Sequence, residues 1–309
     1  MEIRQLEPEG RTVSLEGLYL SHNLQELAKR TGRPIVVANY VTDLNDVIAV
    51  AGVRGSPEEL QNPSDWRLFQ ELTAQADVLI TGTSYMTQFA EKGDGGQNVL
   101  TQFDRGGIFE DLGDWREQNV LKRNPDLAVV SRSLNFSIPK VVSESGRRVF
   151  VFTTHLMQDG EKAKDLEKAG AAVIGAGQEG VDGAVMAKRL DQEGHKVIKI
   201  ITGPRVLKIF MDAEFRNQEA KLIRKGALDR LYITKVHRKI TDDLSEAITV
   251  LEGRKVDDLT SEGGGFKRIE KYAQHNVTRN NGVDTSQEFL VFERLEIAGA
   301  GRQGWQSSR

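Results

Sequence analysis

The sequence contains no cysteine, which excludes disulfides, thiolate nucleophiles and zinc–thiolate sites. It also lacks a long basic stripe: 42 basic and 45 acidic residues give a net charge of −3, so we expect no nucleic-acid partner. No apolar run approaches the length of a transmembrane span, and no basic-then-apolar signal opens the chain. We therefore expect no membrane partner and a cytoplasmic location. The five histidines lie far apart without an H-x-x-x-H pair, so no metal site is expected.

What the sequence does contain is an alternation of short apolar runs and helical segments over residues 35–235. Strand-like runs such as "DVLITG", "LAVVSRS", "RVFVFTT" and "VIKIITG" alternate with helix-like stretches such as "DGEKAKDLEKAG" and "VDGAVMAKRLDQEG". This alternation is typical of an α/β fold with a largely parallel sheet and helices on both faces. With 309 residues and no evident boundary, we expect one domain over residues 32–297.

Three segments are expected to lie outside this regular pattern. Residues 1–31 form an N-terminal extension with a short helix at "NLQELAKRTG", and residues 298–309 form a disordered tail. A stretch rich in glycine and charge, at about 87–126, is expected to be an insertion with little regular structure.

Further helices and strands are expected from local signals. Ser56 opens a capping box with proline at the first helical position, and Asn62-Pro63 opens the next helix. Residues 205–225 are expected to be helical. Two strands at "RIEKYAQHNV" and "QEFLVFERLE" then complete the domain.

Small polar residues, glycines and arginines follow four of the expected strands. These stretches are Thr81-Gly82-Thr83, Ser131-Arg132-Ser133, Thr153-Thr154-His155 and Thr202-Gly203-Pro204-Arg205. Ligands of parallel α/β sheets bind outside the carboxyl ends of the strands. Glycines let a phosphate approach the backbone, helix N-termini offer free N–H groups, and arginine can hold a phosphate bidentately. Gly, Ser and Thr are common loop residues too, but four such ends on one edge favour a nucleotide-binding site.

A second glycine pattern gives an alternative location for that site. Gly175, Gly177 and Gly180 have the G-x-G-x-x-G spacing of a dinucleotide-binding loop and lie between an expected strand and an expected helix. A Rossmann domain also needs an acidic residue at the end of the next strand, but Thr202 and Gly203 stand there. Arg205 could accept a 2′-phosphate instead. The plain alternative is an ordinary loop.

Polar residues also interrupt the apolar run "RPIVVANYVTDLNDVIA". Asn39, Asp43, Asn45 and Asp46 lie where the first long strand ends. Since side chains alternate along a strand, Asn39 and Asp43 would share one face. The tip would then lie at the carboxyl edge of the sheet, beside the expected cofactor site. An Asx-rich turn would give the same pattern.

The order of these motifs resembles the reductase domain of bifunctional riboflavin-biosynthesis proteins. "RPIVVANYVTDLNDVIA" is similar to that family's R-P-x-V-x-x-N-x-x-x-S-L-D-G-x-I-A, and "NPSDWRLFQELTAQADVLITGTSYM" to its helix and strand ending in a glycine–threonine turn. "PDLAVVSRSL", "GVDGAVMAKRLDQEGHKVIKIITGP" and "GALDRLYIT" follow in the family's order, so the resemblance covers roughly residues 33–240. It implies a dihydrofolate-reductase-like three-layer α/β/α fold, NADPH as hydride donor, a ribosylamino-pyrimidine phosphate as small-molecule substrate, and a homodimer.

The resemblance also assigns residues to a site. The expected cofactor-binding residues are Gly82, Thr83, Ser131, Arg132, Thr153, Thr154, Gly203, Pro204 and Arg205. The expected substrate-binding residues are Asn39, Asn45 and Asp65, with Asp46 and Asp43 as candidate catalytic groups that stabilise a cationic imine or relay a proton. In this family the 175–180 loop falls in a variable connection.

The chain departs from the family on the substrate side. The S-L-D-G motif is Asp43-Leu44-Asn45-Asp46 here, and Ile201 replaces the glutamate of E-G-G-P. The segment D-D-P-x-L-T-x-R is missing, and the zinc deaminase half of the bifunctional proteins is absent because its motif needs cysteines. These departures put the substrate in doubt more than the cofactor.

The sequence therefore supports three hypotheses. The first is an NADPH-dependent reductase acting on a ribosylamino-pyrimidine or pterin-like substrate. The second is a non-catalytic nucleotide-binding or interaction protein on the same fold, because fold does not fix function. The third is a Rossmann-type dehydrogenase that uses the 175–180 loop.

Overall fold

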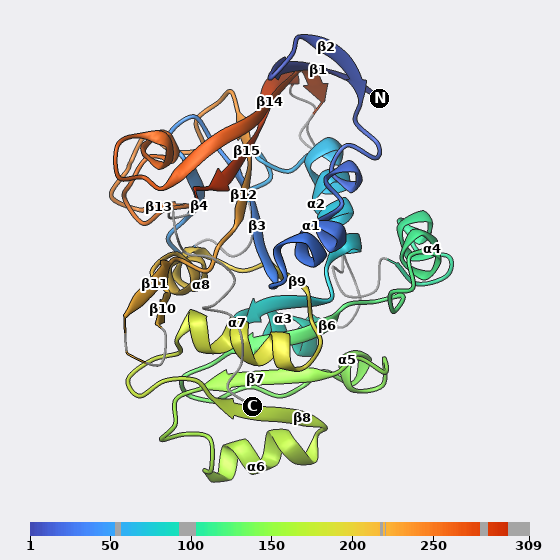
Figure 1. Ribbon diagram of the computed structural model, residues 1–309. Helices are drawn as coiled ribbons and strands as arrows, with labels where there is room; N and C mark the ends of the chain where they lie inside the picture. The colour runs from blue at the N-terminus through green and yellow to red at the C-terminus, as the bar shows by residue number, and fades with distance from the viewer. Residues whose placement is uncertain (53–56, 93–102, 217–218, 220, 279–283, 296–309) are drawn as a thin grey trace.

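A central sheet with helices on both faces organises the chain (Figure 1). The computed structural model describes residues 1–52, 57–92, 103–216, 219, 221–278 and 284–295. Across these residues the main sheet has eleven strands in the order β2-β1-β14-β15-β12-β3-β9-β5-β6-β7-β8. The predicted α/β architecture with a mostly parallel central sheet is confirmed.

Seven neighbouring strands of this sheet run parallel to one another. They are β3 (Ile35–Thr42), β5 (Val78–Gly82), β6 (Asp126–Val130), β7 (Val149–Thr153), β8 (Ala171–Gly175), β9 (Val197–Ile200) and β12 (Arg230–Val236). Four antiparallel strands extend the sheet beyond β12: β1 (Glu2–Glu7), β2 (Arg11–Ser14), β14 (Phe266–Thr278) and β15 (Asp284–Arg294). β7, which lies between two other parallel strands, is covered on both faces, which is why its run "VFVF" is apolar throughout and buried.

Helices cover the two faces of the sheet with separate apolar cores. One face is covered by α1 (Leu24–Thr31), α2 (Pro63–Gln75), α3 (Thr83–Lys92), α5 (Lys140–Ser143) and α6 (Glu161–Lys168). The other face is covered by α7 (Gly183–Gln192) and α8 (Pro204–Met211). Alternate residues of β3 divide between them: Ile35 and Val37 pack in the α2 core, whereas Val36 and Ala38 pack in the α7–α8 core.

Smaller elements decorate this framework. They are α4 (Glu110–Gln118), the 3₁₀ turns η1 (Leu20–His22) and η2 (Val256–Thr260), and two small antiparallel pairs, β4 (Val47–Val50) with β13 (Ala247–Thr249) and β10 (Glu214–Arg216) with β11 (Leu222–Lys225). Within the described ranges, no helix combines the length and apolarity needed to cross a bilayer.

The N-terminal segment was expected to be an extension, and this is wrong. The predicted helix is present as α1, but β1 and β2 are part of the main sheet, and Arg4 pairs with Ala273 of β14. Figure 1 shows these strands at the end of the sheet opposite β8. The signal was the period of two in "EIRQLE", where Ile3 and Gln5 are buried between exposed neighbours.

Two further segments differ from expectation. The region 205–225 is not one helix: α8 ends at Met211, and β10 and β11 follow. The stretch 87–126 contains α4, whose Leu112 packs with Phe103 and Phe109 against α2. Ser56 and residues 298–309 lie outside the described residues, and the stretch after Pro57 forms a turn rather than a helix.

Candidate active site

The order of the strands singles out one place on the sheet. β9 lies between β3 and β5, although it follows both of them in the chain. The chain leaves β3 towards β5 through α2 on one face, and it reaches β9 from β8 through α7 on the opposite face. In open α/β sheets, ligands bind outside the carboxyl ends of the strands at such a switch in strand order.

Two glycine turns meet at this switch point. β5 ends at Gly82, and the residues after β9 continue through Thr202 and Gly203. The turns are close, since a Cβ added at Gly82 would lie 3.3 Å from Thr202 Oγ1. The Tyr40 hydroxyl donates a hydrogen bond of 2.7 Å to the Thr202 carbonyl and so fixes the second turn to β3. The space beside Gly203 is open, because a Cβ there would meet nothing within 4 Å.

Each glycine turn leads directly into a helix. Thr83 is the first residue of α3, and Pro204 is the first residue of α8. Gly203 is the N-cap of α8 and supplies no side-chain hydrogen bond to its first turn. Val206 and Leu207 donate their backbone N–H groups to the Gly203 carbonyl at 3.2 and 3.4 Å. The positive end of the helix dipole is therefore what makes this terminus suited to a phosphate. Pro204 fits because the first helical position needs no N–H.

The other predicted cofactor residues lie along the same edge. β5, β6 and β7 are neighbours, with Gly82 opposite Val130 and Val130 opposite Phe152. The three strands therefore end at about the same level, and the residues that follow them lie along one edge of the sheet. The structure thus brings the predicted strand ends together on one edge. Whether they bind a nucleotide stays a prediction.

The side chains of the predicted cofactor-binding residues differ in how accessible they are to a ligand. Ser131 Oγ accepts a hydrogen bond of 3.0 Å from the Leu134 backbone, so it stabilises its own turn. Thr153 is fully buried, and within the described part of the chain its hydroxyl has no hydrogen-bond partner; Thr154 is also buried. Arg132 and Arg205 are exposed at this edge and are the cations that a bound anion could reach.

The alternative dinucleotide loop is not supported by the topology. β8, which precedes Gly175–Gly180, is the edge strand, and β7, β6 and β5 separate it from β9. A Rossmann loop instead joins neighbouring strands through its helix. The loop is also closed on itself: a Cβ at Gly177, whose φ is +152°, would lie 2.0 Å from the Gly180 carbonyl oxygen. The plain interpretation, a tight strand-to-helix loop, holds.

The candidate catalytic Asp43 is turned into the protein. Its Oδ1 accepts hydrogen bonds from the backbone N–H groups of Asn45 (2.7 Å) and Val47 (2.9 Å), and its Oδ2 accepts one from Ile240 (3.2 Å). The residue is fully buried, and Asn45 beside it is half-buried. Asp43 thus forms the Asx turn that the sequence left open as an alternative.

Asp46 is also held by structural contacts. Its Oδ1 lies 2.8 Å from the Lys235 ammonium, and its Oδ2 accepts a 2.9 Å hydrogen bond from the Val256 backbone. Its backbone is left-handed at φ +66°, a conformation that Asp and Asn tolerate. The two carboxylates therefore fasten residues 238–256 to the end of β3. Whether the tip also takes part in a site stays a prediction.

Asn39 of β3 and Asp65 of α2 lie on the same side of the sheet. Asn39 belongs to the face of β3 covered by α2, and within the described residues its buried Nδ2 has no hydrogen-bond partner. Asp65, in the first turn of α2, is also buried, and its backbone N–H is capped by the Asn62 side chain at 2.8 Å. The structure thus places these two predicted substrate residues on the same side of the sheet.

A buried lysine beneath them was not foreseen. Lys199 Nζ lies 2.6 Å from the Phe69 carbonyl and 2.8 Å from Thr73 Oγ1. Burial lowers the pKa of Lys199 well below its usual range, and the charge of Asp65 offsets part of that effect. In sequence it is one charged residue inside the apolar run "VIKII", and nothing there indicates its partners.

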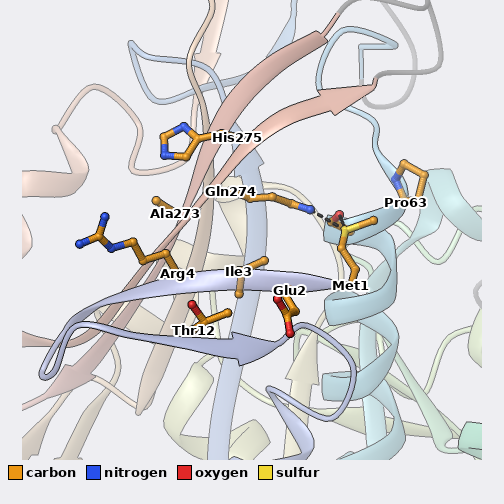
Figure 2. Close-up of a pocket in the computed structure, with 10 residues that line it drawn as sticks. Met1, Glu2, Ile3, Arg4, Thr12, Pro63, Ala273, Gln274 and His275 are labelled. Carbon is orange, nitrogen blue, oxygen red and sulfur yellow. Dashed lines mark hydrogen bonds between the residues drawn. The ribbon is translucent and has the colours of Figure 1, made fainter.

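A pocket of about 550 Å³ opens beside the N-terminus of α2 (Figure 2). It is lined by Met1, Glu2, Ile3, Arg4, Thr12, Pro63, Ser64, Ala273, Gln274 and His275. Gln287 Nε2 donates to Gln274 Oε1 (2.7 Å) and to Asn62 Oδ1 (3.1 Å), so the pocket wall is hydrogen-bonded to the cap of α2. The sequence did not indicate this pocket, because the first residues were not expected to join the sheet.

Comparisons with known proteins agree on the fold. No family model matches the chain, and no curated protein matches its sequence. Among solved structures, a pyrimidine reductase-like protein from Corynebacterium diphtheriae is 19% identical with a TM-score of 0.55, covering 89% of this chain and 99% of that one. The riboflavin biosynthesis reductase Rib7 from Saccharomyces cerevisiae is 10% identical with a TM-score of 0.51, covering 89% and 99%.

A bifunctional enzyme is similar as well. The diaminohydroxyphosphoribosylaminopyrimidine deaminase/5-amino-6-(5-phosphoribosylamino)uracil reductase from Thermotoga maritima is 15% identical with a TM-score of 0.53 over 88% of this chain, which spans 60% of that protein. At these identities the likeness concerns architecture. The chain therefore has the fold of the riboflavin-biosynthesis pyrimidine reductases, as its sequence motifs had indicated.

Proposed function

We propose that this protein is an NADPH-dependent reductase of the riboflavin-biosynthesis type. The observation that carries the proposal is the pair of glycine turns, at Gly82 and Gly203, that meet at the switch in strand order and each lead into a helix. The fold shared with solved pyrimidine reductases supports the same reaction class. The substrate class is a ribosylamino-pyrimidine like the uracil derivative named for the Thermotoga maritima enzyme.

Different residues at the carboxyl edge of the sheet would bind different parts of the cofactor. The turn at Gly203 and the first turn of α8 suit the pyrophosphate, because the space beside Gly203 is open and the positive end of a helix dipole favours a negative charge. Arg132 or Arg205 would bind a 2′-phosphate, which gives a preference for NADPH over NADH. The cofactor supplies the hydride, and the protein supplies position and electrostatics.

The substrate would lie between the end of β3 and the start of α2. Asn39 Nδ2 is a buried donor without a partner in the described chain, and a carbonyl or ring nitrogen of a pyrimidine would satisfy it. The charges of Asp65 and Lys199 interact on this side of the sheet. Asp43 and Asp46 would act by fixing the shape of the site rather than by transferring protons.

The first test is a titration of the purified protein with NADPH and with NADH, followed by calorimetry. We expect tight, NADPH-selective binding. Arg132→Ala or Arg205→Ala should lower the affinity for NADPH about tenfold, the effect of losing one charge-assisted contact, and so show which arginine carries the selectivity. Oxidation of NADPH with 5-amino-6-(5-phosphoribosylamino)uracil then tests the reaction. Failure to bind either nucleotide would reject the reductase, and binding without turnover would favour a non-catalytic nucleotide-binding protein.

We also propose a cytoplasmic homodimer, as the family resemblance implies. Light scattering of the purified protein at micromolar concentration tests the oligomeric state. A monomer under those conditions would reject the dimer without affecting the proposed chemistry.

A further inference from the structure

β3 extends beyond the end of β9 at the switch in strand order. The last ladder pair between these two strands is Ala38 with Ile200, whereas the ladder between β3 and β12 continues to Thr42. The residues that follow β9, Thr202 and Gly203, therefore leave the sheet beside a part of β3 that is held by β12 on its other side. On the β3 side, this turn has no strand ladder to order it.

The side chain of Tyr40 makes the contact that the ladder does not. Its hydroxyl donates a hydrogen bond of 2.7 Å to the carbonyl of Thr202, and its ring packs against the apolar core on the α7–α8 face. The backbone of Tyr40 is fixed in the ladder with β12, opposite Ile233. Burial raises the pKa of the Tyr40 hydroxyl, so the group stays protonated and remains a donor. The turn is thus tied to a well-held strand by a hydrogen bond.

This hydrogen bond also fixes the direction of a backbone donor. The Thr202 carbonyl and the Gly203 N–H belong to one planar trans peptide, so they point in opposite directions. In the described part of the chain this N–H has no hydrogen-bond partner, and the space beside Gly203 is open. Because Tyr40 holds the carbonyl, the N–H points away from Tyr40. A hydrogen bond to the carbonyl also polarises the peptide and strengthens the N–H as a donor.

We propose that Tyr40 is a positioning residue, which orders the turn at Gly203 so that its N–H meets a phosphate oxygen of the bound dinucleotide. A turn that already has its binding conformation loses less conformational freedom when the ligand binds, so the ligand binds more tightly. The N–H acts together with the positive end of α8, which begins at the next residue. The identity of the ligand as a dinucleotide rests on the proposed function.

The alternation of side chains along β3 separates this effect from the substrate. Tyr40 packs on the α7–α8 face, whereas Asn39, the proposed substrate residue, lies on the face covered by α2. Loss of the Tyr40 hydroxyl should therefore weaken cofactor binding, and it should leave the KM for the pyrimidine and the kcat at saturating cofactor unchanged.

The first experiment needs no ligand. Tyr40→Phe removes the hydroxyl and keeps the ring, and hydrogen exchange is measured in the free protein at Val206 and Leu207, whose N–H groups bond to the turn. We expect exchange there about three- to tenfold faster, the effect of losing one neutral hydrogen bond. Tyr272→Phe on β14 is the matched control, because it also removes one hydroxyl hydrogen bond, of 2.8 Å to Glu270, and it should leave these amides unchanged. Unchanged exchange in Tyr40→Phe would overturn the proposal.

The second experiment measures the Kd of NADPH by calorimetry and the oxidation of NADPH with 5-amino-6-(5-phosphoribosylamino)uracil. Tyr40→Phe should raise the Kd and the KM for NADPH about three- to tenfold with kcat unchanged, and Tyr272→Phe should change neither. A fall in kcat with an unchanged Kd for NADPH would overturn the proposal and leave the reductase intact. A wild type that binds neither nucleotide would reject the proposed function, and with it the dinucleotide as the ligand of Gly203, even where the exchange rates differ.

Discussion

The substitution Asp46→Asn tests whether the Asp46 carboxylate has a structural or a catalytic role. Asparagine keeps the size of the side chain, tolerates the left-handed backbone at φ +66°, and can still accept from Val256. What it removes is the charge opposite Lys235, whose side chain is 13% exposed. Breaking one partner of a buried ion pair costs about 3–5 kcal/mol, and the partial exposure of Lys235 favours the lower end, about 3 kcal/mol.

Thermal and urea unfolding measure this loss, which corresponds to a fall in Tm of roughly 6–10 °C for a large domain. Lys235→Met should destabilise comparably, since it leaves the carboxylate unpaired. The double variant should recover much of the loss because no buried charge remains uncompensated. Asp242→Asn, the same change at an exposed position of the neighbouring segment, is the control and should stay within about 0.5 kcal/mol of wild type.

Turnover completes the test. If Asp46 only fastens residues 238–256 to β3, kcat measured well below the Tm should remain within a few-fold of wild type. An unchanged Tm combined with a fall in kcat of about a hundredfold, the contribution of a general acid or base, would refute this reasoning and make Asp46 catalytic.

Three other changes have defined outcomes. Burial alone would raise the pKa of Asp126, but hydrogen bonds from His195, Lys122 and Arg148 outweigh it and hold the pKa below its usual range. The stability that this carboxylate contributes is therefore complete above about pH 4 and is lost as the pH falls further. The destabilisation caused by Asp126→Asn, measured by urea unfolding, should shrink below that pH. Gly177→Val should lower stability by more than 2 kcal/mol, because its Cβ would meet the backbone; wild-type stability would show that the loop can open. Arg116→Met should cost about 3 kcal/mol in the same assay, since it leaves the carbonyls at the end of α2 without their donor.

Several parts of the fold could be predicted because local signals and tertiary packing agree. The strands "VFVFT" and "VIKI" are apolar runs bounded by turn residues, and Asn62-Pro63 marks the start of α2 with both a cap and a proline. The strand ends at Gly82 and Gly203 could be assigned to one edge because parallel strands all end on the same side. These inferences needed no knowledge of long-range contacts.

The parts that failed depend on partners far away in the chain. β1 is a strand because β14, about 270 residues later, pairs with it, and the two buried residues Ile3 and Gln5 are too short a signal alone. The structural contacts of Asp43 and Asp46 could not be predicted either, because the sequence cannot show that Ile240 and Val256 bring backbone N–H groups to them. Lys199 and the pocket at Ser64 were missed for the same reason.

The late insertion of β9 between β3 and β5 has a consequence for how the protein is made. During synthesis β3 and β5 emerge first, and β5 can pair with β6 on one side, but the sides of β3 and β5 that face β9 stay unpaired until residues 197–200 have been translated. The glycine turn at Gly203 and the first turn of α8 appear at the same moment, so the proposed cofactor site is absent from every shorter nascent chain. The proposed nucleotide therefore cannot stabilise an early nascent chain, and β3 must remain unpaired, or be protected by a chaperone, until β9 has been made.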